Sequence, residues 1–238
     1  MANTAVVYDR KYDDKVLQFE TSGGLLNASL VMRDAQTDSW WSIMTGDAID
    51  GSMKGQKLKE LPSIGEKTTW GAWRQKHPNS RVLSVDGIEH DDSNPYNNYF
   101  TSDQTFRGMK IDDDRMKPKQ SIFSFQYDGT AYAVAFDEFE DGGLFEFHGD
   151  NNHSAQIFVY RPQGVSIFQS SVAYRVPRDL VEYHRGSWRF QGEKEWQFLS
   201  DEASLQTLAI QKDVLQLSGF DTFWYNWVAV HTNTVVLE

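Results

Sequence analysis

The stretch that decides the fold is Thr69-Trp70-Gly71-Ala72-Trp73-Arg74-Gln75-Lys76-His77-Pro78. Its pattern occurs again near the end of the sequence, in Phe223-Trp224-Tyr225-Asn226-Trp227-Val228-Ala229-Val230-His231-Thr232. Both copies read Trp-x-x-Trp-x-x-x-His, and their matching residues differ by 154 positions. This spacing places both indoles and the imidazole of each copy on one face of a short helix. The expected N-cap of the first helix is Thr68 or Thr69, and Pro78 prevents its continuation.

Segments of β-strand character repeat ahead of the two tryptophan–histidine copies. Residues 133–137 match 5–9, and residues 158–161 match 30–33, both at an offset of 128 positions. Because short strand patterns dominate, the sequence predicts a mainly β fold of two pseudo-symmetric halves, barrel-like or sandwich-like. A short Trp/His helix closes each half in this prediction. The sequence predicts a single domain with a first half at residues 1–87, a connector at 88–127 and a second half at 128–238. The second half contains an insertion near residues 172–196.

Composition narrows the classes of function. The chain has 238 residues, a formal net charge of −11 and 14% aromatic residues. A nucleic-acid partner is disfavoured, because phosphate binding needs a basic surface. No apolar run is long enough to span a bilayer, and no signal peptide opens the sequence. The absence of cysteine excludes disulfides, thiolate metal sites and a cysteine nucleophile, so a metal would need histidine and carboxylate ligands.

The two tryptophan–histidine copies are the first candidate site. In one interpretation His77 and His231 face each other and share a ligand or a metal. In the other, the indole and imidazole groups pack in the two cores, each polar N–H bonded to backbone. Two tyrosines of the connector could line a cleft for an aromatic or sugar ligand. The candidate ligand-binding residues are therefore Trp70, Trp73, His77, Trp224, Trp227, His231, Tyr96 and Tyr99.

An acidic loop at residues 86–98 is the second candidate. Loops rich in oxygen ligands can hold a hard cation such as calcium, although a solvated turn has the same composition. The candidate metal ligands are His77, His231, His90, Asp91 and Asp92. Two further charged clusters, at residues 112–119 and 137–141, are interpreted as exposed turns. The alternative for the first cluster is a phosphate-binding site, and the alternative for the second is a general acid/base pair.

Several motifs resemble one known family. Residues 41–58 are similar to its pattern Trp-Ser-Gln-x-x-Gly-x-Ala-Ile-x-Gly-x-x-x-Gly-x-x-Leu, and further matches are Thr69-Trp70-x-x-Trp73, Pro95-Tyr96-x-x-Tyr99 and Phe223-Trp224-Tyr225-x-Trp227. The chain thus resembles the domain of unknown function 3179 family, often described as a "(seleno)protein". The resemblance implies a bacterial or archaeal protein, mostly extracytoplasmic, with no established activity.

The resemblance also has a clear gap at the N-terminus. Family members typically carry Cys-Pro-x-Cys, sometimes with selenocysteine, directly before the strand that begins here at Asn3. Ala2 stands where the last cysteine would fall. Either an N-terminal segment was removed or the chain belongs to a branch without the motif. Thiol or selenol chemistry is therefore not carried over to this chain.

No familiar catalytic motif is present in the sequence. It contains no Gly-x-Ser-x-Gly, no His-Glu-x-x-His, no phosphate-binding glycine loop and no dinucleotide fingerprint. We therefore expect a non-catalytic, β-rich binding or assembly module for a small-molecule or protein partner. The alternative is a metal-dependent or redox enzyme with its site between the two halves. The sequence predicts neither a particular cofactor nor an oligomeric state.

Overall fold

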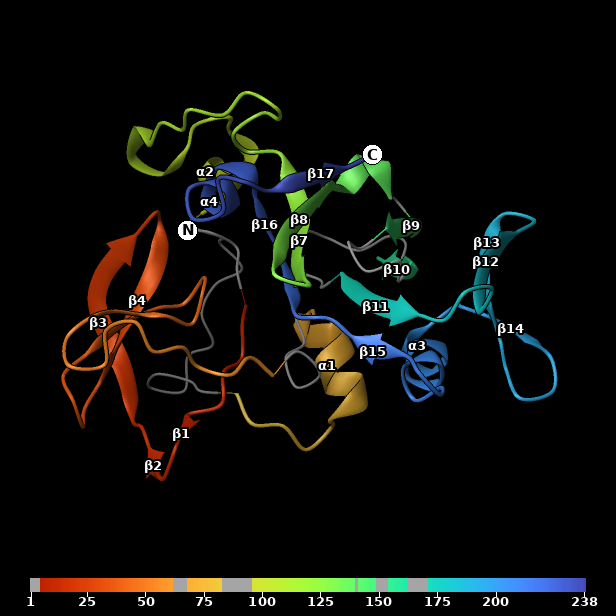
Figure 1. Ribbon diagram of the computed structural model, residues 1–238, viewed down its shortest axis with the longest axis horizontal. Coiled ribbons are helices and arrows are strands. Elements are labelled where there is room, and N and C mark those ends of the chain that lie inside the picture. Colours follow the sequence, from red (N-terminus) through yellow and green to blue (C-terminus); the bar gives the residue numbers. More distant parts are fainter. Residues whose placement is uncertain (1–4, 62–67, 83–95, 140, 149–153, 162–170) are drawn as a thin grey trace.

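The computed structural model describes residues 5–61, 68–82, 96–139, 141–148, 154–161 and 171–238. The fold is mainly β, as the sequence predicts (Figure 1). The strands are β1 (Lys11–Tyr12), β2 (Lys15–Val16), β3 (Phe19–Leu26), β4 (Ser29–Asp34), β5 (Trp40–Ser42), β6 (Ala48–Asp50), β7 (Ser121–Tyr127), β8 (Thr130–Ala135), β9 (Gly143–His148), β10 (Ser154–Tyr160), β11 (Val172–Val176), β12 (Val181–His184), β13 (Ser187–Gln191), β14 (Trp196–Phe198), β15 (Leu215–Gln216), β16 (Gly219–Phe223) and β17 (Val235–Leu237). The helices are α1 (Trp70–Lys76), α2 (Asn97–Thr101), α3 (Glu202–Ala209) and α4 (Trp224–Val228), with 3₁₀ turns η1 (Phe106–Gly108) and η2 (Phe136–Glu138).

The central layer is a four-stranded sheet in the order β16-β7-β8-β17. Strands β7 and β8 form an antiparallel hairpin, and β17 joins β8 in parallel. The hairpin turns at Asp128-Gly129, both with positive φ, which is the two-residue connection that suits the twist of the strands. Alternate residues of β7 face opposite sides of this sheet, so the strand contributes to two different cores.

One of these cores lies between the central sheet and a second sheet in the order β15-β11-β10-β9. Phe123 and Phe125 of β7 pack there against Ile157 and Val159 of β10. The other face of the second sheet is covered by α3 and by the meander β12-β13-β14, most of which falls in the segment predicted to be an insertion. The arrangement is sandwich-like, and within the described ranges no sheet closes into a barrel.

The opposite face of the central sheet is covered by α4. Trp224 and Trp227 of this helix pack on Ile122 of β7 and Ala133 of β8, and both indoles are fully buried. Because every residue of α4 is buried, this helix forms part of the core between the central sheet and the N-terminal part of the chain.

The N-terminal sheet has the order β3-β4-β5-β6 and reaches α4 through the β3–β4 turn. The turn residues Asn27 and Ala28 both have positive φ, and Ala28 packs in a cluster with Phe223 and Tyr225. Asn226 donates a 2.8 Å hydrogen bond to the carbonyl of Asn27. In return, the Asn27 amide donates to the carbonyl of Ala229 at 3.4 Å. This exchange fixes the hairpin against α4.

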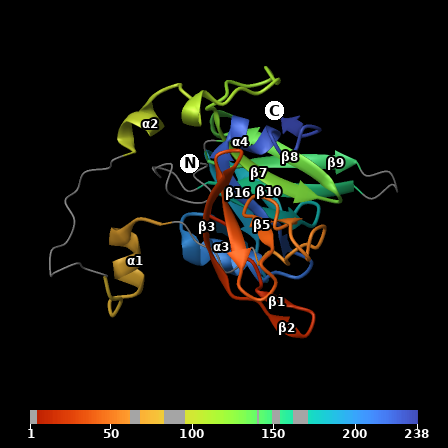
Figure 2. The same cartoon turned by 90° about the vertical axis from the view of Figure 1, so that its left-hand side faces the viewer.

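Helix α1 has a different environment from α4. It begins after the N-cap Thr69, whose hydroxyl accepts from the backbone N–H of Ala72 at 3.3 Å, and it ends at His77 before Pro78. None of its residues is buried. Figure 2 shows α1 at the side of the molecule, away from the sheets. Of the two helices expected to close the halves, α4 is the one placed in a core.

Candidate functional site

The two tryptophan–histidine units have the same local geometry. The rings of Trp73 and His77 lie 4.1 Å apart between centroids at 39°, and those of Trp227 and His231 lie 4.0 Å apart at 40°. In both units the backbone N–H of the histidine donates a hydrogen bond to the backbone carbonyl of the second tryptophan, at 2.8 Å in α1 and 3.0 Å in α4. The motif therefore specifies a tilted contact between the indole and imidazole rings in each copy.

The structure places the two units at different sites. Helices α1 and α4 lie apart in both views (Figures 1 and 2). His77 is exposed, whereas His231 is partly buried, with its Nε2 3.5 Å from the amide nitrogen of Gln126. Trp70 is 47% exposed and Trp224 is completely buried. The other predicted metal ligands, His90, Asp91 and Asp92, lie outside the described residues.

The predicted tyrosines of the connector also separate. Tyr96 is exposed ahead of α2, whereas the hydroxyl of Tyr99 lies 2.6 Å from that of Tyr225 in α4. Lys119 donates to the carbonyl of Tyr99, and its ammonium lies 4.0 Å from the centre of the Tyr99 ring. Burial lowers the pKa of Lys119, with Asp103 acting in the opposite direction. Tyr99 thus connects α2 to α4 in this structure.

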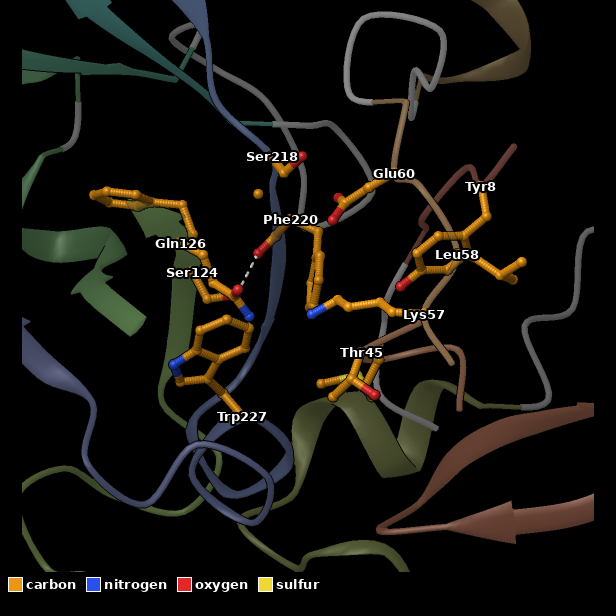
Figure 3. A pocket seen from close by; sticks show the side chains of 13 residues that line it. Tyr8, Thr45, Lys57, Leu58, Glu60, Ser124, Gln126, Ser218, Phe220 and Trp227 are labelled. Carbon is orange, nitrogen blue, oxygen red and sulfur yellow. Dashed lines mark hydrogen bonds between the residues drawn. The ribbon is translucent and has the colours of Figure 1, made fainter. Parts of the chain in front are cut away.

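A cleft of about 280 Å³ lies between the N-terminal segment and the central sheet (Figure 3). One wall comes from Tyr8, the turn between β5 and β6, and the segment after β6, and the other from β7, β16 with the residue before it, and α4. The lining residues are Tyr8, Met44, Thr45, Lys57, Leu58, Glu60, Ser124, Phe125, Gln126, Ser218, Gly219, Phe220 and Trp227. Of the residues predicted from sequence, Trp227 lines this cleft directly, and His231 lies three residues beyond the end of α4.

Two isolated β-bridges place the ionisable groups of the first wall. Tyr8 pairs with Glu60, and Asp47 pairs with Lys57. Directly opposite residues of an antiparallel pair have neighbouring side chains on the same face. Gly46 allows Tyr8 to lie close, because a Cβ there would come within 2.7 Å of the Tyr8 ring and its φ of +72° favours glycine. The Tyr8 hydroxyl donates a 2.9 Å hydrogen bond to the carbonyl of Ile43.

The second wall is held rigid by close strand packing. Gly219 of β16 has no room for a side chain, since a Cβ would lie 2.7 Å from both the Phe123 ring and the Ser124 carbonyl. The hydroxyl of Ser124 donates to the carbonyl of Phe220 at 2.9 Å. Figure 3 shows this bond at the back of the cleft, with Gln126 beside Trp227. The wall therefore offers buried main chain and aromatic surface.

The cleft perturbs the ionisable groups around it. Burial raises the pKa of Glu60, while a hydrogen bond with Ser218 and the charge of Lys57 lower it. Burial also raises the pKa of Tyr8, and the carboxylates of Glu60 and Asp47 add to that effect. For His231, burial lowers the pKa to about 4, helped by Lys57 and opposed by Asp47. His231 is therefore neutral at pH 7. Shifted ionisable groups gathered in a cleft are typical of functional sites.

Sequence reasoning did not single out Tyr8, Lys57 or Glu60. Lys57 lies within the family-like run at residues 41–58. The spaced glycines of this run were the one sequence feature that indicated tight turns near Lys57. Those glycines form the tight turns that bring residues 46–48 next to residues 56–58. The composition around Glu60 carries no comparable signal.

The described residues contain neither a metal-binding cluster nor a membrane-spanning helix. Among them, no group of three or more histidine, aspartate or glutamate side chains is arranged to hold a metal ion. Within the same ranges no helix is both long and apolar enough to cross a bilayer.

Comparison with known proteins identifies a family. A family model described as "Protein of unknown function (DUF3179)" matches residues 1–234. Neither the curated proteins nor the solved structures contain a match to the chain.

Proposed function

Because the chain belongs to the DUF3179 family, whose function is unknown, we propose a function from the cleft itself: this protein is a binding module for a small polar molecule. The observation that carries the proposal is the meeting of two dissimilar walls. Ionisable side chains of the N-terminal segment face aromatic and main-chain surface of β7, β16 and α4. Ligand sites in proteins combine apolar walls with a few converging polar groups in this way.

A non-catalytic role agrees with the placement of the polar groups. The hydroxyls of Tyr8 and Ser124 already donate to backbone carbonyls, so neither is poised as a nucleophile beside a base. Lys57, Glu60 and Gln126 supply charges and an amide for recognition. We also propose an extracytoplasmic location, on the family resemblance alone, which fractionation of cells expressing the native gene would test.

Screening by ligand-observed NMR tests the binding role. We expect a subset of small amino acids, organic acids, amines or sugars to bind the wild-type protein. Thr45→Trp fills the cleft from its N-terminal wall and should abolish that binding. Thr101→Trp, at an exposed position of α2, is the matched control and should retain it. If no compound binds, or if binding survives Thr45→Trp unchanged, the proposal is wrong.

The second candidate function is an enzyme whose active site is the same cleft, and one observation favours it. The pKa of Glu60 is raised by burial, a property that general acids and bases share. This candidate predicts that bound molecules are converted and that Glu60→Gln stops conversion while binding persists. Its metal-dependent form predicts stoichiometric metal in the purified protein, which elemental analysis would measure.

A further inference from the structure

Lys57 and Glu60 present opposite charges to one cleft. In Figure 3 the Lys57 side chain extends towards Phe220, and the Glu60 carboxylate lies near Ser218. Within the part of the chain that the structure describes, neither residue takes part in an ion pair. The side chain of Lys57 is exposed and Glu60 is partly buried, so the cost of burying a charge falls mainly on the Glu60 carboxylate. Both charges are therefore available to a ligand.

The internal partners of these charges compensate them only in part. Asp47 neighbours Lys57 across a β-bridge without forming an ion pair. Glu60 has Ser218 as a neutral hydrogen-bond partner, and the charge of Lys57 lowers its pKa without the two groups forming an ion pair. The two charges come from positions three apart on one segment, so a single small molecule can contact both. Such a molecule would need an anionic group for Lys57 and a cationic group for Glu60.

The remaining lining sets the size and character of the rest of the ligand. The volume of about 280 Å³ lies just below the range of about 300–1,000 Å³ that is usual for drug-sized ligands. Met44, Leu58 and Phe220 add apolar surface beside the charged groups. We infer that the ligand is a small zwitterion, a free α-amino acid with an apolar side chain, whose carboxylate binds Lys57 and whose ammonium binds Glu60. This inference rests on the proposed binding function.

Calorimetric titration with three related probes tests the inference. L-leucine carries both charges, 4-methylpentanoate carries only the carboxylate, and 3-methylbutylamine carries only the ammonium. We expect leucine to bind, and each analogue to bind at least about tenfold more weakly, because each analogue lacks one of the two charge-assisted contacts, with Lys57 or with Glu60, that leucine makes.

Two variants assign each end of the ligand. Lys57→Met should remove the advantage of leucine over the amine, and Glu60→Gln should remove its advantage over the carboxylate. Lys54→Met, on an exposed turn outside the cleft, is the matched control and should bind all three probes as the wild type does. Circular dichroism of each variant shows whether the fold is retained.

The outcomes separate this inference from the proposed function. If the three probes bind equally, or if the two variants leave the selectivity intact, the zwitterion assignment is overturned. If leucine fails to bind while another class of molecule binds and is excluded by Thr45→Trp, the assignment is also overturned but the binding function stands. If no small molecule binds, both fail.

Discussion

Helices α1 and α4 share the Trp-x-x-Trp-x-x-x-His pattern and the same backbone hydrogen bonds at their C-terminal ends. However, α1 is exposed to solvent and α4 lies in the core. After each histidine the chain turns alike, with Ser80 N–H donating to the His77 carbonyl at 3.0 Å and Thr234 N–H to the His231 carbonyl at 3.1 Å. The two tilted ring pairs differ by only 0.1 Å in the distance between ring centroids. The shared residues therefore determine local geometry without determining burial.

The residues between the shared positions explain the difference in burial. Where α4 has Tyr225 and Asn226, α1 has Gly71 and Ala72, which offer far less surface to a core. After the second tryptophan, α4 continues with Val228, whereas α1 continues with Arg74. Apolar side chains all round favour a buried helix, and a charged face favours solvent. An internal duplication, which stays a prediction, would have left one copy in each environment.

The largest effect expected from this comparison is on stability when the second tryptophan is removed. Trp227→Ala deletes a fully buried indole and should lower the free energy of unfolding by about 3–5 kcal/mol. Trp73→Ala removes a partly exposed indole and should cost less than about 1 kcal/mol. Urea denaturation of both variants measures the difference. Equal losses would show that α1 is buried in solution as deeply as α4.

A smaller effect is expected from the contact between α4 and the β3–β4 turn. Asn226→Ala removes the 2.8 Å bond to the Asn27 carbonyl inside the core and should cost about 2 kcal/mol. The reverse exchange in α1, Ala72→Asn, places an amide on a helix without buried residues and should change stability by less than about 0.5 kcal/mol. Thermal unfolding of the two variants makes the comparison. A silent Asn226→Ala would mean that the turn does not depend on this bond.

The sequence predicted those features that local patterns encode. Short strands gave the mainly β class, and Thr69 with Pro78 set the ends of α1 as observed. The burial difference between the helices was not predicted, because the shared tryptophan–histidine spacing concealed the unlike residues between them. The cleft was not predicted either. Its ionisable pairs depend on single β-bridges, Tyr8 with Glu60 and Asp47 with Lys57, and an isolated bridge leaves no periodic signal in the sequence.

The smallest effect expected from the comparison concerns the two histidines and pH. Burial, with help from Lys57 and opposed by Asp47, lowers the pKa of His231 to about 4 in the folded protein. The unfolded chain has a histidine pKa of about 6.5, so it binds the proton more readily. The contribution of His231 is therefore fully present above pH 6.5 and is lost as the pH falls towards 4. Because the ring is only partly buried, we expect a loss of about 1 kcal/mol between pH 7 and pH 5.

The matched pair His231→Asn and His77→Asn isolates this contribution from the other groups that titrate in the same window. Glu60, whose pKa is raised, acts in the opposite direction and is present in both variants. The difference in unfolding free energy between pH 7 and pH 5 should shrink in His231→Asn and stay at the wild-type value in His77→Asn, whose side chain is exposed. Chemical denaturation at the two pH values measures it. If both substitutions alter the pH dependence equally, the imidazole of α1 is as shielded in solution as that of α4, and the contrast between the helices does not hold.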